Sequence, residues 1–169
     1  GVWGAGLIVD SLGSYDLAWQ IGVVIGARAR NVTADAAWEH VAGLVPVNDV
    51  TARDLQTADG QWSRAKGFDT FCPIGSASTV SHDDFTDVTL VTRVNGEERQ
   101  RAKASEMVFS IPALISYITR IMTLEAGGIV SPGTPEGVGS LSPGDEVEVE
   151  LEGLDILRNP VDGEGDVGS

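Results

Sequence analysis

The chain has 169 residues, of which 42% are hydrophobic, which is enough for one domain with a buried core. Eleven Lys and Arg residues against 25 Asp and Glu residues give a net charge of −14, so nucleic acid and anionic membrane surfaces are unfavourable partners. Only Lys66 and Lys103 are lysines. Dense carboxylates with so little lysine favour a halophilic protein, and an ordinary acidic cytosolic protein is the alternative.

Processing and location leave few marks in the sequence. No apolar run approaches the roughly 20 residues of a membrane span, and no basic segment precedes an apolar run at the start. One cysteine, Cys72, excludes an internal disulfide and is expected to be a buried structural thiol in a reducing cytoplasm. The abrupt start GVWGAGLIVD is compatible with a processed or truncated chain.

The first third of the chain predicts strands around one helix. Residues 1–15 show no regular pattern, whereas residues 20–25 (QIGVVI) are β-branched and predict a buried strand. Thr33 suits the N-cap of a helix that Gly43 would end. A further strand is expected over residues 44–50, and the proline within it indicates either a sheet edge or the start of the strand. The helix after Thr33 is predicted from the helical spacing of its apolar residues Ala37, Val41 and Leu44.

The remainder predicts a hairpin, a helix and two more strands. Asn95-Gly96 between residues 88–94 and 97–102 is typical of a type I′ turn in a β-hairpin. Ser110 begins a helix with a proline in its first turn and an apolar stripe. A Gly/Pro-rich loop, two strands over residues 146–161 and a frayed tail over residues 162–169 follow. The apolar stripe of the helix that begins at Ser110 consists of Leu114, Ile115, Ile118 and Met122. We therefore predict one mixed α/β, mainly β domain over residues 1–169.

Seven separated segments resemble the fumarylacetoacetate hydrolase superfamily, in order and at similar spacing, over about residues 20–161. They are IGVVIGARARNV, HVAGLVPVNDVTARDLQ, DGQWSRAKGFDTFCPIG, LVTRVNGEERQRA, MVFSIPALISYITRIMTLEAGG, GTPEGVGSLSPGDEVEVELEG and LRNPV. The resemblance is to the C-terminal catalytic domain of that superfamily. It implies a β-roll with flanking helices, and a homodimer.

The resemblance also implies a chemistry. Members such as fumarylacetoacetate hydrolase, acylpyruvase and 2-hydroxyhepta-2,4-diene-1,7-dioate isomerase act on small 2-oxo or diketo acids. They hydrolyse a C–C bond, isomerise or decarboxylate through an enolate-like species. A divalent cation, Mg²⁺ or Mn²⁺, chelated by the substrate stabilises the charge on that oxygen.

Five residues match the functional positions that the resemblance implies. Asp49 matches a metal-binding aspartate, and Arg53 and Gln56 match substrate-contacting residues of the same motif. Lys66 matches the active-site lysine, a catalytic and substrate-binding residue, and Thr134 matches a loop threonine that holds a carboxylate. Alternatives stay open: Asp49 as a turn cap, Arg53 in an exposed ion pair with its neighbour, and Thr134 as a turn former.

The metal site departs from the resemblance at two positions. The superfamily carries two glutamates in an E-x-E arrangement, whose alternation along a strand sends both carboxylates to one face. Ala18 and Gln20 occupy those positions, so only a neutral amide oxygen is offered. Asp16 lies on the same face and would substitute if the strand shifted by two residues. These replacements weaken the expected Mg²⁺ or Mn²⁺ site.

A second departure concerns the catalytic base. The His/Glu pair that activates water in the hydrolases has no match in residues 1–15, and neither His40 nor His82 replaces it. Two hypotheses follow. The chain is an active, metal-assisted enzyme on a small 2-oxo acid, or it is a pseudoenzyme that binds a small carboxylate or a partner subunit without turnover. An active parent that was altered or shortened would give the same sequence.

Overall fold

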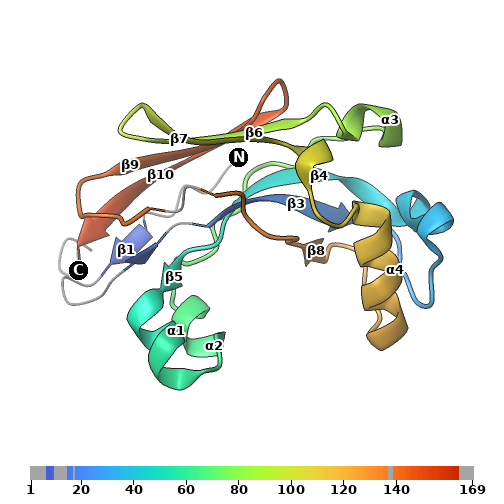
Figure 1. The fold of residues 1–169 in the computed structure, drawn as a ribbon, viewed down its shortest axis with the longest axis horizontal. Coiled ribbons are helices and arrows are strands. Elements are labelled where there is room, and N and C mark those ends of the chain that lie inside the picture. The colour runs from blue at the N-terminus through green and yellow to red at the C-terminus, as the bar shows by residue number, and fades with distance from the viewer. Residues whose placement is uncertain (1–6, 10–14, 17, 137–138, 164–169) are drawn as a thin grey trace.

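A computed structural model describes residues 7–9, 15–16, 18–136 and 139–163 of the chain. The described strands form three sheets, which Figure 1 shows as two main layers with helices at their ends. The five-stranded sheet has the order β1-β10-β9-β6-β7, the three-stranded sheet the order β4-β3-β8, and β2 pairs with β5. The expected mixed α/β, mainly β class is confirmed.

The five-stranded sheet is built on two hairpins. β6 (Thr89–Val94) and β7 (Glu97–Lys103) are joined by Asn95 and Gly96, whose φ angles of 54° and 78° are those of the expected type I′ turn. β9 (Glu146–Leu151) and β10 (Asp155–Gly163) form the second hairpin, also as expected. β1 (Leu7–Val9) pairs in parallel with the end of β10.

The three-stranded sheet faces this layer and shares its core. β3 (Trp19–Ile25) pairs antiparallel with β4 (Val41–Asn48) and with the short β8 (Ile129–Val130). β4 contacts β9 and β10, and β3 contacts β6. Apolar residues of both layers therefore close into one buried cluster, including Trp19, Val23, Leu44, Val149 and Leu157.

Short helices flank the layers, and one long helix lies at the end of the three-stranded sheet (Figure 1). The short elements are β2 (Tyr15–Asp16), β5 (Thr51–Ala52), α1 (Arg53–Asp59), α2 (Ser63–Lys66), α3 (His82–Phe85) and the 3₁₀ turn η2 (Ala104–Glu106). The long helix α4 (Ile111–Ile121) begins where expected, because the Ser110 hydroxyl accepts from the Ala113 N–H. No helix among the described residues is long and apolar enough to span a membrane.

Two sequence predictions about helices are wrong in detail. Only the first part of the expected helix is helical, as the 3₁₀ helix η1 (Ala34–His40), and the Thr33 side chain accepts no capping hydrogen bond. Val41 and Gly43 already belong to β4, because Val41 pairs with Ile25 across the sheet and this pairing overrides the local helical spacing. In α4 the apolar stripe ends early: Met122 follows the last helical residue and is 57% exposed.

The chain ends also differ from expectation. Residues 7–9 and 15–16 form β1 and β2, although the sequence predicted an irregular start. The start of the predicted frayed tail, residues 162–163, lies in β10, and residues 164–169 lie outside the described residues. These strands form because β1 pairs with β10 and β2 pairs with β5, and the local sequence does not predict such long-range pairing.

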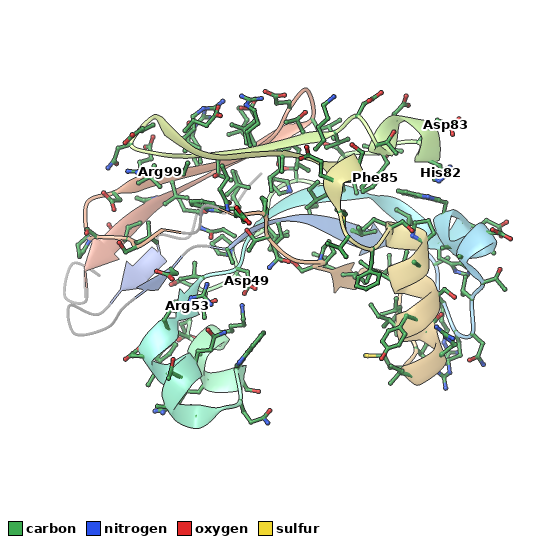
Figure 2. All side chains as sticks on the ribbon, in the orientation of Figure 1. Asp49, Arg53, His82, Asp83, Phe85 and Arg99 are labelled. Atoms are coloured by element: carbon green, nitrogen blue, oxygen red, sulfur yellow. The ribbon has the colours of Figure 1, made fainter. Side chains whose placement is uncertain are left out.

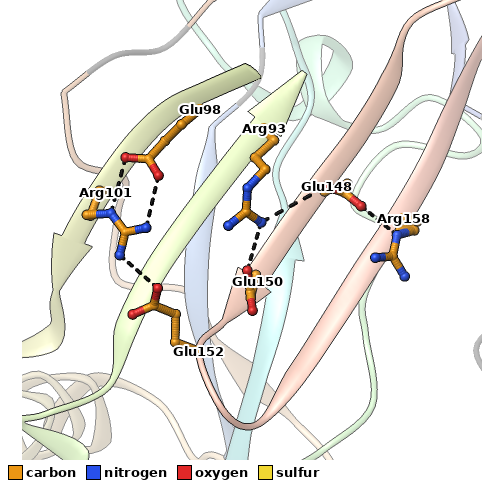
Figure 3. A network of polar contacts seen from close by, with 7 residues as sticks. All are labelled: Arg93, Glu98, Arg101, Glu148, Glu150, Glu152 and Arg158. Carbon is orange, nitrogen blue, oxygen red and sulfur yellow. Dashed lines mark hydrogen bonds and ion pairs between the residues drawn. The ribbon is translucent and has the colours of Figure 1, made fainter. Parts of the chain in front are cut away.

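The outer face of the five-stranded sheet carries a ladder of ion pairs (Figure 3). Arg101 lies 2.9 Å from Glu98 and 2.7 Å from Glu152, and it lowers the pKa of both carboxyl groups through hydrogen bonds. Arg93 contacts Glu150 at 2.7 Å. The ladder comprises Arg93, Glu98, Arg101, Glu148, Glu150, Glu152 and Arg158. Arg93 and Arg158 pair with glutamates of the neighbouring strand β9, whereas Glu98 and Arg101 lie on the same strand, and each pair makes a small contribution.

Candidate functional site

The candidate site forms where β4 turns into β5 and α1. Asp49 follows the last residue of β4, and its backbone N–H donates to the carbonyl of Ala18 at 2.8 Å. This bond places the Asp49 side chain beside the start of β3. Figure 2 shows Asp49 above α1 and α2, and Arg53 at the start of α1.

Lys66, the last residue of α2, contacts Asp49 directly. Its Nζ donates to Asp49 Oδ2 in a short contact and to the Thr51 hydroxyl at 3.0 Å. The side chains of Lys66 and Asp49 are 27% and 21% exposed, so the ion pair is partly buried. Since water screens such a pair only partly, it is stronger than a surface ion pair.

Gln20 joins Asp49 to the loop that follows β8. Its Nε2 donates to Asp49 Oδ2 at 2.9 Å, while its Oε1 accepts from Ser131 Oγ at 2.6 Å and from the Gly133 N–H at 2.8 Å. A backbone N–H can only donate, so the Gly133 contact fixes which end of the amide faces Asp49. That end is the NH₂ group.

Arg53 belongs to a neighbouring group of contacts. Its Nε donates to Asp16 Oδ2 at 3.0 Å, and its Nη1 donates to Gln56 Oε1 at 2.8 Å. The ion partner of Arg53 is thus Asp16, in place of the adjacent residue considered from the sequence. Asp16 pairs with Thr51 across β2 and β5, and Thr51 is two residues after Asp49 in the chain. The contacts of Arg53 therefore lie next to the Asp49–Lys66 pair.

The shift that would have brought Asp16 to the Asp49 carboxylate does not occur. β3 starts at Trp19, which pairs with Asn48, and this register leaves Ala18 and Gln20 beside Asp49. Of the two positions matched to the glutamates, Gln20 contacts Asp49 through its side-chain amide and Ala18 through its backbone carbonyl.

Thr134 lies apart from the Asp49–Lys66 pair. It lines a cavity of about 470 Å³, and its hydroxyl contacts the carbonyl of Pro135 at 3.4 Å. Neither Asp49 nor Lys66 lines this cavity. Its walls are mainly apolar and include Ile21, Leu90, Met107, Val108, Phe109 and Leu114. The described contacts join Thr134 to the site only through its neighbour Gly133, which is bound to Gln20.

Comparison with known families identifies this arrangement. A sequence model described as the C-terminal part of fumarylacetoacetate (FAA) hydrolase matches residues 7–162. The chain belongs to the fumarylacetoacetate hydrolase family. The resemblance found in the sequence and the expected fold are thereby confirmed, and membership places the chain in a family of isomerases, tautomerases, decarboxylases and hydrolases.

Individual family members match over most of the chain. The chain is 40% identical to the oxaloacetate tautomerase YisK of Bacillus subtilis over 86% of its length and 39% identical to the mitochondrial oxaloacetate tautomerase FAHD1 of Rattus norvegicus over 85%. The crystal structure of a 5-carboxymethyl-2-hydroxymuconate delta-isomerase from Mycobacterium smegmatis superposes with a TM-score of 0.90 at 39% identity, over 96% of the chain and 65% of that protein. The chain spans 52% of YisK and 67% of FAHD1. It spans 61% of a Methanocaldococcus jannaschii relative with which it is 47% identical.

The donor atoms at the site do not fit the divalent cation that the family commonly uses. Among the described residues no group of three or more His, Cys, Asp or Glu side chains could hold a metal ion. Asp49 Oδ2 already accepts from Lys66 and from Gln20, and Gln20 points N–H groups, not oxygen, at that position. Mg²⁺ and Mn²⁺ require several oxygen ligands. One carboxylate beside an ammonium does not supply them.

Three residues that contact Lys66 or Gln20 were not predicted from the sequence as part of the site. Thr51 lies two residues after Asp49, so strand alternation offered a local signal for it. Ser131 and Gly133 lie more than 110 positions from Gln20, and their contacts follow from the pairing of β8 with β3. Gly133 contacts Gln20 through its backbone N–H, and a sequence motif does not indicate the partner of a backbone group.

Cys72 lies close enough to the site to respond to its charges. It is exposed and has a φ of 63°, so the prediction of a buried thiol is wrong. Partial burial raises the pKa of the thiol, the Asp49 charge raises it further, and Lys66 acts in the opposite direction. A raised thiol pKa disfavours the thiolate, which agrees with a residue that is not a nucleophile.

Proposed function

We propose that this chain is the ligand-binding domain of a family enzyme that interconverts the keto and enol forms of a small 2-oxo acid. The observation that carries the proposal is the half-buried contact between Lys66 Nζ and Asp49 Oδ2. It sets a cationic donor beside a carboxylate, and both side chains keep part of their surface exposed to solvent. Because the two charges compensate each other, the pair does not repel an anionic ligand.

The chemistry needs both groups. In the keto-to-enol direction, a proton leaves the carbon next to the oxo group and passes to the Asp49 carboxylate. The C–H electron pair forms the new carbon–carbon double bond, and the carbonyl π pair moves onto oxygen. Lys66 stabilises that oxygen by hydrogen bonding and charge and donates a proton to it, which gives the enol. The proton taken up by Asp49 returns to Lys66 through their direct contact. Arg53 and Gln56, in the adjacent group, are proposed to hold a second carboxylate of the ligand.

The relatives support a proton-transfer reaction. YisK and FAHD1 are named oxaloacetate tautomerases, and a Dictyostelium discoideum relative that is 37% identical is named a mitochondrial oxaloacetate decarboxylase. Decarboxylation and C–C hydrolysis share the enolate-like intermediate, so the same charge arrangement serves all three.

A second candidate is a pseudoenzyme that binds a small carboxylate without turnover. Ala18 and Gln20 favour it, because they replace the two expected carboxylates. The test follows the decay of enol oxaloacetate by ultraviolet absorbance, with the wild type and Asp49→Asn. Catalysis by the wild type that Asp49→Asn abolishes supports the enzyme. Oxalate binding to a wild type that leaves the decay rate at the buffer value supports the pseudoenzyme, and no binding by either protein refutes both.

We also propose a homodimer in a cytoplasm of high ionic strength. Exposed apolar side chains gather around the start and the outer face of α4, where an exposed apolar patch is typical of an interface. They are Val108, Phe109, Tyr117 and Ile121. Cys72 is a free thiol, as a reducing compartment allows. Light scattering should give twice the chain mass of 17.7 kDa, and a mass of one chain would contradict the dimer.

A further inference from the structure

We infer that Gln20 performs the linking role of a divalent cation in this chain, so that Asp49 and the 131–134 loop are held together without a metal ion. The inference rests on the proposed location of the site but not on the proposed turnover. Gln20 is a positioning residue in this view, because it acts through Asp49 and the loop. Lys66 supplies the positive charge.

The Gln20 amide uses both of its ends. The side chain is 5% exposed, and its oxygen accepts two hydrogen bonds, from Ser131 Oγ and the Gly133 N–H. Its nitrogen donates to Asp49. A cation bound to Asp49 Oδ2 would meet this NH₂ group, whose partial charge is positive. The buried amide therefore disfavours a cation while it satisfies the groups that a cation would otherwise organise.

The charge balance at the site agrees with this role. Asp49 and Lys66 carry one charge each, of opposite sign, and Gln20 and Ala18 carry none. Glutamates at positions 18 and 20 would add two negative charges that no described cation of this network compensates. A divalent cation is the counterion that such a cluster requires. The replacement of both glutamates removes that requirement in one step.

Position 18 could still reach the site. The Ala18 carbonyl accepts from the Asp49 N–H at 2.8 Å. Ala18 directly precedes β3 and is two residues from Gln20, so continued alternation would set both positions on one face. A glutamate side chain at position 18 would extend toward the Asp49 carboxylate from this backbone. The backbone of a three-carboxylate site is therefore present, and only two side chains are missing.

The first experiment restores those side chains and measures thermal unfolding with and without Mn²⁺, with EDTA as the reference. Ala18→Glu/Gln20→Glu is compared with the wild type and with Ala58→Glu/Gln61→Glu, which adds the same charge at two exposed positions of the described chain. At a Mn²⁺ concentration about 100-fold above its Kd, we expect the unfolding temperature of the restored variant to rise by about 5–10 °C. The wild type and the surface variant should shift by less than about 1 °C.

Two results would overturn the inference. One is a wild type that binds Mn²⁺ at one site by calorimetry and loses it in Asp49→Asn. The other is a restored variant that folds but is no more stabilised by Mn²⁺ than the surface variant. If the restored variant folds only with Mn²⁺, that gain supports the inference. If it fails to fold in either condition, the calorimetric comparison of wild type with Asp49→Asn decides.

The metal readouts separate this inference from the proposed function. Mn²⁺ binding and thermal shift need no 2-oxo acid, so the inference can hold for a chain that turns nothing over. Conversely, enol oxaloacetate decay in EDTA tests turnover alone. A wild type that is active only with Mn²⁺ would confirm the enzyme and overturn the role of Gln20.

Discussion

Replacing Lys66 with Met removes the ammonium group and keeps most of the side-chain length. In the wild type, this ammonium donates to Asp49 Oδ2 and to the Thr51 hydroxyl. After the substitution, Asp49 keeps its contact with Gln20, and Thr51 loses its partner on Lys66. The Lys66→Met variant should therefore fold, with a weakened junction between α2 and the segment that follows β4.

The expected cost follows from the contacts. A hydrogen bond to a charged group contributes about 1.5–3 kcal/mol, and the neutral contact to Thr51 contributes about 1 kcal/mol. Asp49 is 21% exposed and can regain some water, which offsets part of the loss. We therefore expect the free energy of unfolding to fall by about 1–3 kcal/mol. Loss of the donor to the ligand oxygen should lower the rate of enol oxaloacetate conversion by about 100- to 1000-fold.

Urea unfolding and the enol oxaloacetate assay measure the two effects, and oxalate calorimetry measures ligand affinity. Lys103→Met is the matched control, since Lys103 is the other lysine of the chain and lines the cavity that contains Thr134. It should leave activity and oxalate affinity unchanged. If Lys103→Met abolishes binding while Lys66→Met retains it, the ligand binds in that cavity and the assignment to Asp49 and Lys66 is refuted.

Three further predictions concern stability. Arg101 depresses the pKa of Glu98 and Glu152 below the ordinary value of 4.5, so the stability they contribute is present above about pH 4.5 and is lost as the pH falls through the depressed values. Arg101→Met should therefore lose less of its unfolding temperature than the wild type between pH 7 and pH 3.5, and an equal loss would contradict the ladder. With a net charge of −14, the urea midpoint should rise from dilute buffer to molar KCl, and an unchanged midpoint would exclude the halophilic interpretation. Leu157→Ala, at a fully buried position, should cost about 2–5 kcal/mol by urea unfolding, and a cost below 1 kcal/mol would contradict the described core.

Local patterns predicted the elements whose determinants are local. The hairpin over residues 89–103 follows from Asn95-Gly96, and α4 follows from Ser110 and the apolar positions behind it. The prediction of a helix up to residue 43 was wrong because Val41 pairs with Ile25, and local spacing cannot indicate this distant partner. The prediction of an irregular start missed β1 for the same reason, since β1 pairs with β10 at the other end of the chain.

Some residues of the site could likewise be predicted from the sequence, and others only from the structure. Asp49 and Lys66, both singled out from the resemblance, contact each other in the structure although they are 17 positions apart. The partner of Arg53 was missed, because Asp16 approaches it through the β2–β5 pairing. The resemblance, which implies a glutamate at position 20, indicated that Gln20 offers only a neutral amide to a metal ion. Only the structure shows that its amide is turned with the nitrogen toward Asp49, because that orientation is set by Gly133 on a distant loop.

The most direct test of the account is a crystal structure of the chain grown with oxalate and Mn²⁺. The account predicts an oxalate oxygen at roughly 3 Å from Lys66 Nζ, with Gln20 still joined to Asp49 and no Mn²⁺ between Asp49 and the ligand. A Mn²⁺ ion that bridges Asp49 and oxalate, or oxalate seated in the cavity beside Met107 and Phe109, would contradict it.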